Sequence, residues 1–126
     1  MGNVLLVGAG GFVGSTLRFV VTNVAQSLFS ERFPIGTLIV NLVGCLLIGA
    51  ISQVFESRSE SSESLRLFLV VGILGGFTTF SSFGNDTINA MRSSAVLLAG
   101  INVASQVVGG LFLVWLGRLM VQVVCK

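Results

Sequence analysis

The sequence has no histidine and few charged residues, and both shortages narrow the possible functions. Its 126 residues include seven Lys or Arg and five Asp or Glu, so charged residues make up 10%, whereas soluble domains carry roughly 25%. Without histidine, ordinary zinc sites and histidine-based catalysis are not expected. We expect no enzyme, because the carboxylates outside the apolar stretches are scattered over predicted loops: Glu31, Glu56, Glu60 and Glu63.

Cysteine and basic residues are also sparse. The two cysteines, Cys45 and Cys125, have neither the spacing of a disulfide framework nor that of a metal site. The net charge of +2 is spread over loops and ends without a basic patch, so nucleic acid is not an expected partner. The first basic residue, Arg18, follows the first apolar run instead of preceding it, which predicts a retained span rather than a secretory signal.

Long uncharged stretches dominate the rest of the chain. Hydrophobic residues make up 53% and the mean hydropathy is +0.98. A helix that crosses a bilayer needs about 20 apolar residues. The pattern predicts an all-α membrane protein, with one domain over residues 1–126 and four spans at approximately 3–24, 34–55, 65–91 and 95–123. The polar stretch from Glu56 to Arg66 is the predicted loop between the second and third spans.

Small residues recur four positions apart within the predicted spans: Gly10 with Gly14, Cys45 with Gly49, Gly72 with Gly76, and Ser105 with Gly109. Such pairs let helix backbones approach closely in lipid. Four helices packed in this way leave little room for a pathway inside one subunit, so we expect a dimer. In the third span, Gly and Thr residues that weaken a helix predict a break near residues 75–80.

The first glycines also fit a different motif. Gly8, Gly11 and Gly14 follow an apolar run, and Glu31 lies near the distance expected of a ribose-binding acid in a dinucleotide-binding fold. That fold alternates strands with helices that have polar outer faces, which the uncharged stretches downstream cannot supply. Helix packing is therefore the preferred explanation of these glycines.

Neutral hydrogen-bonding residues are the candidates for chemistry at membrane depth: Thr37, Asn41, Thr78, Thr79, Ser81, Ser82, Asn102, Ser105 and Gln106. They can donate to an anion without a fixed positive charge, or they can bond to neighbouring helices. Phe77, Phe80 and Phe83 are interleaved with hydroxyls, and an anion can approach the positive edge of a ring; packing is the alternative. Asp86, at the edge of a span, is the only candidate acid, which argues against a proton-coupled exporter.

Three segments together carry a resemblance to a known family. They are GSTLR at 14–18, GTLIVNL at 36–42 and GGFTTFSSF at 75–83. In this combination the chain resembles the small dual-topology fluoride channels called Fluc or CrcB, over essentially its whole length. The resemblance implies an antiparallel homodimer in the lipid of a bacterial or archaeal plasma membrane, with two pathways for passive export of cytoplasmic fluoride and hence fluoride resistance.

The resemblance also implies roles for single residues. The fluoride pathway would comprise Phe80, Phe83, Asn41 as a donor, and a polar track of Thr37, Ser81 and Ser82. Vestibule or secondary positions would be Arg18, Asp86, Asn102 and Gln106. A structural Na⁺ would be held by the backbone carbonyls of Gly75 and Thr78. The sequence departs from the family pattern at Gly84, where Ser is frequent, and at Asn102, Gln106 and Gly110, where hydroxyls are frequent.

The basic residues near the span ends give a weak orientation bias. One side of the membrane would hold Arg58, Arg66, Arg118 and Lys126, and the other Arg32 and Arg92, with Arg18 if it reaches that face. Because orientation follows the Lys and Arg count near the span ends, insertion in both orientations is predicted. Two alternatives stay open: a dual-topology transporter of another ion or drug, and a membrane packing subunit that transports nothing.

Overall fold

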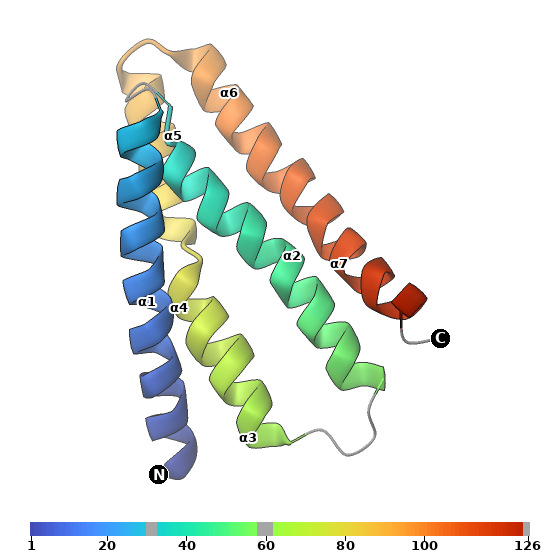
Figure 1. The fold of residues 1–126 in the computed structure, drawn as a ribbon. Coiled ribbons are helices and arrows are strands. Elements are labelled where there is room, and N and C mark those ends of the chain that lie inside the picture. Colours follow the sequence, from blue (N-terminus) through green and yellow to red (C-terminus); the bar gives the residue numbers. More distant parts are fainter. Residues whose placement is uncertain (30–32, 58–61, 125–126) are drawn as a thin grey trace.

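The computed structural model describes residues 1–29, 33–57 and 62–124, which form four long helical stretches side by side (Figure 1). The first two are α1 (Gly2–Leu28) and α2 (Ile35–Ser57). The third consists of α3 (Glu63–Arg66), η1 (Leu67–Leu74), α4 (Gly75–Phe77) and α5 (Phe80–Arg92). The fourth consists of α6 (Val96–Ala104), η2 (Ser105–Gly109) and α7 (Gly110–Val124). The start of α1 and the end of α7 lie at the same end of the bundle, as an even number of spans requires (Figure 1).

All four stretches are long and apolar enough to cross a membrane, with mean hydropathies between 1.7 and 2.2. Large apolar side chains cover the outside of the bundle, including Phe12, Val108 and Leu111. In water such a surface would be costly, whereas lipid tails are as apolar as these side chains. The predicted all-α fold with four spans and a break in the third is confirmed. The predicted antiparallel dimer stays a prediction.

The helix ends differ from the predicted loops. Glu56 and Ser57 belong to the last turn of α2, and residues 63–66 form α3, so the predicted loop from Glu56 to Arg66 was wrong at both ends. Ser62 begins α3 as an N-cap, because its side chain accepts a hydrogen bond from the Leu65 amide. Residues 58–61, and with them Arg58 and Glu60, lie outside the described residues. So do Glu31, Arg32, Cys125 and Lys126.

Glycines bring α1 against the first half of the third span. A β-carbon added at Gly10 would lie 2.9 Å from the Gly72 Cα, and one added at Gly76 would lie 2.7 Å from the Gly11 carbonyl oxygen. A β-carbon added at Gly14 would overlap the Ile73 carbonyl. The two predicted small-residue pairs of these helices therefore pack against each other, backbone on backbone.

The Gly8, Gly11 and Gly14 motif lies entirely inside the continuous helix α1. A dinucleotide-binding turn needs a strand before its glycines, and the described residues contain none. Gly11 and Gly14 contact the third span, which agrees with the packing explanation, whereas a β-carbon at Gly8 would meet nothing within 4 Å.

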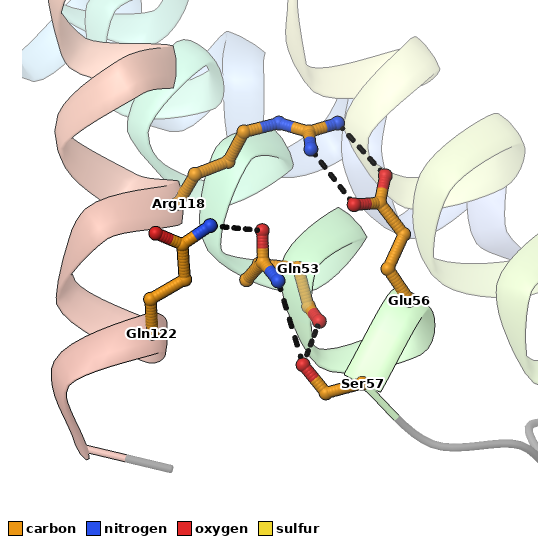
Figure 2. A network of polar contacts seen from close by, with 5 residues as sticks. All are labelled: Gln53, Glu56, Ser57, Arg118 and Gln122. Atoms are coloured by element: carbon orange, nitrogen blue, oxygen red, sulfur yellow. Dashed lines mark hydrogen bonds and ion pairs between the residues drawn. The ribbon is translucent and has the colours of Figure 1, made fainter. Parts of the chain in front are cut away.

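The second and fourth stretches run side by side and are joined at their C-terminal ends by a polar clamp (Figure 2). The Arg118 guanidinium donates to both carboxylate oxygens of Glu56, at 2.9 and 3.0 Å. Beside it, the Gln122 amide donates to the Gln53 oxygen at 3.1 Å. Immediately before the clamp in each helix, α2 and α7 approach closely at Gly49 and Gly117, each against the backbone of the other helix.

Two stretches, η1 and η2, have the wider turns of a π-helix. Such turns are uncommon and are frequent at functional sites. The stretch η1 ends three residues before the break in the third span, and η2 contains Gln106. Both therefore lie next to the polar residues described below.

Candidate functional site

The third span is interrupted at Thr78 and Thr79, where the backbone is extended. In an α-helix the Thr79 amide would donate to the Gly75 carbonyl; here it donates to the Asn41 side-chain oxygen at 2.8 Å. The Asn41 amide nitrogen returns a bond to the Thr79 carbonyl at 3.0 Å. One side chain of α2 thus bonds to both backbone groups of Thr79, and its oxygen satisfies the amide that the break exposes, as membrane depth demands.

The same threonine begins the second half of the span. The Thr79 hydroxyl accepts from the Ser82 amide at 3.2 Å, which is the bond of an N-cap. It also bonds to the hydroxyls of Ser81 and Ser82, at 3.2 and 3.1 Å. Two of the predicted polar-track residues therefore gather in the first turn of α5.

Phe80 and Phe83 lie one turn apart on α5, with ring centroids 5.4 Å apart and planes tilted by 57°. Phe80 is 82% exposed in the single chain, whereas Phe83 is half-buried. Both rings line a cavity of about 340 Å³ beside the break, together with Asn41 and Gln106. Tilted rings present edges as well as faces, so this cavity combines positive ring edges with amide groups and no charged side chain.

A second cavity, of about 810 Å³, opens where α1, α2, α5 and α6 meet. Thr37 and Asp86 line it, and the Thr37 hydroxyl donates to the Asp86 carboxylate at 2.8 Å. Thr37 lies one turn before Asn41 on α2, and Asp86 one turn after Phe83 on α5. The two cavities therefore follow each other along the same pair of helices.

Side-chain amides connect α2, the fourth span and α5. The Asn41 nitrogen donates to the Gln106 oxygen at 2.6 Å, and the Gln106 nitrogen donates to the Asn102 oxygen at 3.0 Å. The Asn102 nitrogen donates to the Thr87 hydroxyl at 2.9 Å, and Thr87 donates to the Phe83 carbonyl at 2.8 Å. We call the side chains of Asn41, Gln106, Asn102 and Thr87 the amide belt.

Arg18 projects from α1 to the break, where its guanidinium donates to the Thr78 carbonyl at 3.3 Å. It is not among the residues that line either cavity above. Thr78 O has no α-helical donor, because the Ser82 amide that would supply one caps onto Thr79. The Arg18 bond therefore satisfies a carbonyl that the break leaves free.

The two carbonyls predicted to hold Na⁺ differ in their surroundings. The Gly75 carbonyl has lost its α-helical donor, since the Thr79 amide bonds to Asn41. Gly75 is exposed, and it lines the cavity beside the break. The Thr78 carbonyl already accepts from Arg18. Oxygen ligands suit a hard cation, so the Gly75 carbonyl fits the predicted ion, while the Thr78 carbonyl fits it only if the guanidinium moves away.

The structure thus gathers six of the predicted pathway and vestibule residues into two cavities. Phe80, Phe83, Asn41 and Gln106 share one cavity, and Thr37 and Asp86 share the other. Asn102 lines neither and is 1% exposed. Sequence reasoning missed Thr87, whose only signal was its position one turn after Phe83, on the face of α5 that turns toward the fourth span.

Membrane-length helices around polar cavities define a small multi-pass membrane protein with the features of a transport protein. The family model described as CrcB-like protein, Camphor Resistance (CrcB), matches residues 5–118. The chain belongs to this family, and it is a multi-pass protein of the cell membrane.

Relatives of known name agree along nearly the full length. A fluoride-specific ion channel FluC of Ruminiclostridium cellulolyticum is 38% identical over 124 residues, which is 98% of this chain and 95% of the relative. Fluoride-specific ion channels FluC of Chlorobium phaeobacteroides and Pseudomonas putida are 46% and 48% identical, over 90% and 88% of this chain and 88% and 90% of theirs. These relatives are named as channels, a class without enzymatic chemistry.

Proposed function

We propose that this protein is a fluoride-selective channel that lets cytoplasmic fluoride leave the cell passively and so gives fluoride resistance. The observation that carries the proposal is the cavity beside the break, where ring edges of Phe80 and Phe83 stand next to amide groups with no charged side chain among the lining residues. The names of the relatives point to the same ion.

This cavity suits a small anion that must enter and leave. A channel has to bind its ion strongly enough to replace hydration and weakly enough to release it. Ring edges supply a weak positive potential. Ser81 and Ser82 lie in the same turn, outside the residues that line this cavity. The Ser82 hydroxyl accepts from Thr79 and so keeps its own hydrogen for an ion that passes along the turn. A fixed cation would hold fluoride too tightly for conduction.

Asn41 keeps in this proposal the donor role that the family resemblance implied, but it must exchange a hydrogen bond to fulfil it. Both hydrogens of its amide nitrogen are engaged, one by the Thr79 carbonyl and one by Gln106. Breaking the bond to Thr79 would undo the support of the helix break. In the proposed route, a bond from Asn41 to fluoride therefore replaces the bond to Gln106.

The functional form in this proposal is an antiparallel homodimer in which two copies complete two pathways. Its support is the 82% exposure of Phe80 beside a polar cavity, since one copy leaves this ring uncovered. The weak Lys and Arg bias fits insertion in both orientations. Labelling of an added C-terminal cysteine, in a chain lacking Cys125, should mark both membrane faces; labelling from one face only would exclude the homodimer.

Within the dimer, a central Na⁺ is proposed on the backbone carbonyls of Gly75 and Thr78. Each copy supplies two oxygens, so two copies supply four, closer to the six or more that hard cations prefer. The free Gly75 carbonyl supports this site. Prolonged removal of Na⁺ should lower dimer stability, and an unchanged dimer would remove the ion from the proposal.

Fluoride efflux from proteoliposomes tests the function directly. The purified chain should release fluoride and retain chloride. Phe80→Ile and Phe83→Ile keep apolar bulk and remove the ring, so each should lower efflux at least ten-fold while the elution profile of the dimer is unchanged. Release of another ion or drug would favour the alternative transporter, and a folded chain that releases nothing would indicate a packing subunit.

A further inference from the structure

Together with the backbone from Thr79 to Phe83, the amide belt forms a closed ring of bonds. It begins at the Thr79 backbone, passes through α2 and the fourth span, and returns to the Phe83 carbonyl. Thr79 and Phe83 are one helical turn apart, and Phe80 lies on the backbone between them. The turn that carries both candidate pathway rings is therefore one side of this ring of bonds.

The direction of every bond in the belt follows from its first one. Asn41 must accept from the Thr79 amide and donate to the Thr79 carbonyl, which fixes which of its side-chain atoms is oxygen. Its nitrogen then faces Gln106, so Gln106 must offer its oxygen there and its nitrogen to Asn102. Asn102 is left with its nitrogen toward Thr87. Only one orientation of each amide satisfies all the bonds.

Asn102 is the buried link in this ring. Its side chain is 1% exposed and lines neither cavity, so it does not meet an ion in either of them. Gln106, by contrast, lines the cavity beside the break. Its long side chain has several rotatable bonds and is held there by its two belt bonds.

We propose that Asn102 is a positioning residue of the fluoride pathway, which holds Gln106, and through it Asn41, in the orientation that fluoride encounters. This inference rests on the proposed channel function. When Asn102 is replaced by an apolar residue, the Gln106 nitrogen loses its acceptor, the glutamine rotates, and Asn41 loses a fixed partner. The donors at the cavity then no longer hold one arrangement.

The sharpest test uses Asn102→Asp, with efflux measured over a range of pH. A protonated Asp reproduces Asn102, since its carbonyl oxygen accepts from Gln106 and its hydroxyl donates to Thr87. The ionised form cannot donate to Thr87. The measured quantity is the ratio of the efflux rate of Asn102→Asp to that of the parent at the same pH. This ratio should be close to one at pH 5.5 and should fall at least five-fold by pH 8.5.

The groups around this position should not add a pH dependence of their own to the ratio. Gln106 and Thr87, which bond to Asn102, do not titrate. Asp86, next to Thr87 in sequence, bonds to Thr37 and is present in the parent too. A role confined to filling space predicts a ratio that is constant with pH. Because an ionised carboxylate at this buried position could also destabilise the fold, the elution profile of the dimer is measured at each pH and should not change.

Two further pairs complete the experiment. Asn102→Leu should lower efflux at least ten-fold, whereas Ser105→Ala, which removes only a bond to the helix backbone, should leave it at the parent rate. Thr87→Val should lower efflux and Thr87→Ser should restore it, because the serine hydroxyl can make the same bonds. A parent that releases no fluoride overturns the channel function and this inference together. A conducting parent with a flat Asn102→Asp ratio and an Asn102→Leu variant that conducts at the parent rate overturn the inference alone.

Discussion

The two halves of the third span are held in place by different means. The first half, residues 63–77, lies against α1 through glycines, and the contacts there are between backbones. The second half, α5 with its N-cap Thr79, is held by bonds that involve side chains. Asn102 of α6 donates to Thr87 and Thr37 of α2 donates to Asp86. The Asn41 side chain of α2 accepts from the Thr79 amide. The Thr78–Thr79 break separates the two.

This difference indicates that the two halves of the third span have different roles, one fixed in place and one adjustable. Backbone contacts have no adjustable atoms, so the first half is fixed and any added atom must displace a helix. Side-chain bonds can be exchanged one at a time, and they place donors where an ion can use them. The half that carries Phe80 and Phe83 is the adjustable one.

The largest effect is expected from an added methyl group on the rigid side. In Gly14→Ala the new β-carbon overlaps the Ile73 carbonyl, so we expect a loss of more than about 3 kcal/mol in the free energy of unfolding. Gly8→Ala, on the same helix with nothing within 4 Å, is the matched control and should be neutral or slightly stabilising. Equal stability of the two variants in a denaturation series would contradict the rigid contact.

On the adjustable side, the largest effect is expected at Asn41. Asn41→Leu removes three bonds and leaves the Thr79 amide unpaired, which should cost about 2–4 kcal/mol of stability and abolish efflux. Asn41→Asp can still accept from Thr79 but cannot donate, so it should be more stable than the leucine variant and still fail to conduct. If the aspartate variant conducts at the parent rate, the donor bonds of Asn41 are not needed.

A smaller effect is expected at the vestibule. Thr37→Val removes the bond to Asp86 while keeping the shape of the side chain. The carboxylate then loses a partner, so we expect about 1 kcal/mol of destabilisation and a several-fold change in efflux. Thr37→Ser keeps the hydroxyl and should behave as the parent; a serine variant as impaired as the valine would show that packing, not the bond, matters.

The smallest effect is expected at the clamp between α2 and α7. It serves as the reference for how much an exposed polar contact contributes to stability. The side chains of Arg118 and Glu56 are 41% and 54% exposed, and exposed ion pairs contribute about 0–1 kcal/mol. Arg118→Gln should therefore change stability by less than about 1 kcal/mol, with efflux unchanged. Thermal unfolding at low and high salt measures this, and a loss as large as that of Asn41→Leu would refute the ranking.

Much of the fold could be predicted because lipid imposes simple rules on composition. Uncharged stretches marked the four spans, and the run from Gly75 to Thr79 marked the break. Pairs such as Gly10 with Gly14 indicated close contact. Which helix they would contact was not predictable, since any small-residue pair fits any other.

The site was predictable in its residue types but not in its connections. The sequence identified the neutral polar residues within the predicted spans as candidates. It did not identify their partners, because an amide can bond in several directions. That Asn41 supports the Thr79 backbone, or that Asn102 is buried behind Gln106, depends on helix positions that periodicity does not give. The π-helical stretches shift these positions further, and they leave no mark in the sequence pattern.

Because the bonds of the amide belt run in one direction only, substitutions of its members during evolution should depend on one another. If one member changes to a residue that reverses or removes its donor, a donor is left facing a donor, or an acceptor an acceptor. The lineage then loses fitness until a second substitution pairs donor with acceptor again. Asn102 and Gln106 should therefore be inherited as a pair among relatives, with replacements at one position accompanied by replacements at the other. Such pairing would mark the belt in a set of related genomes as clearly as the bonds mark it here.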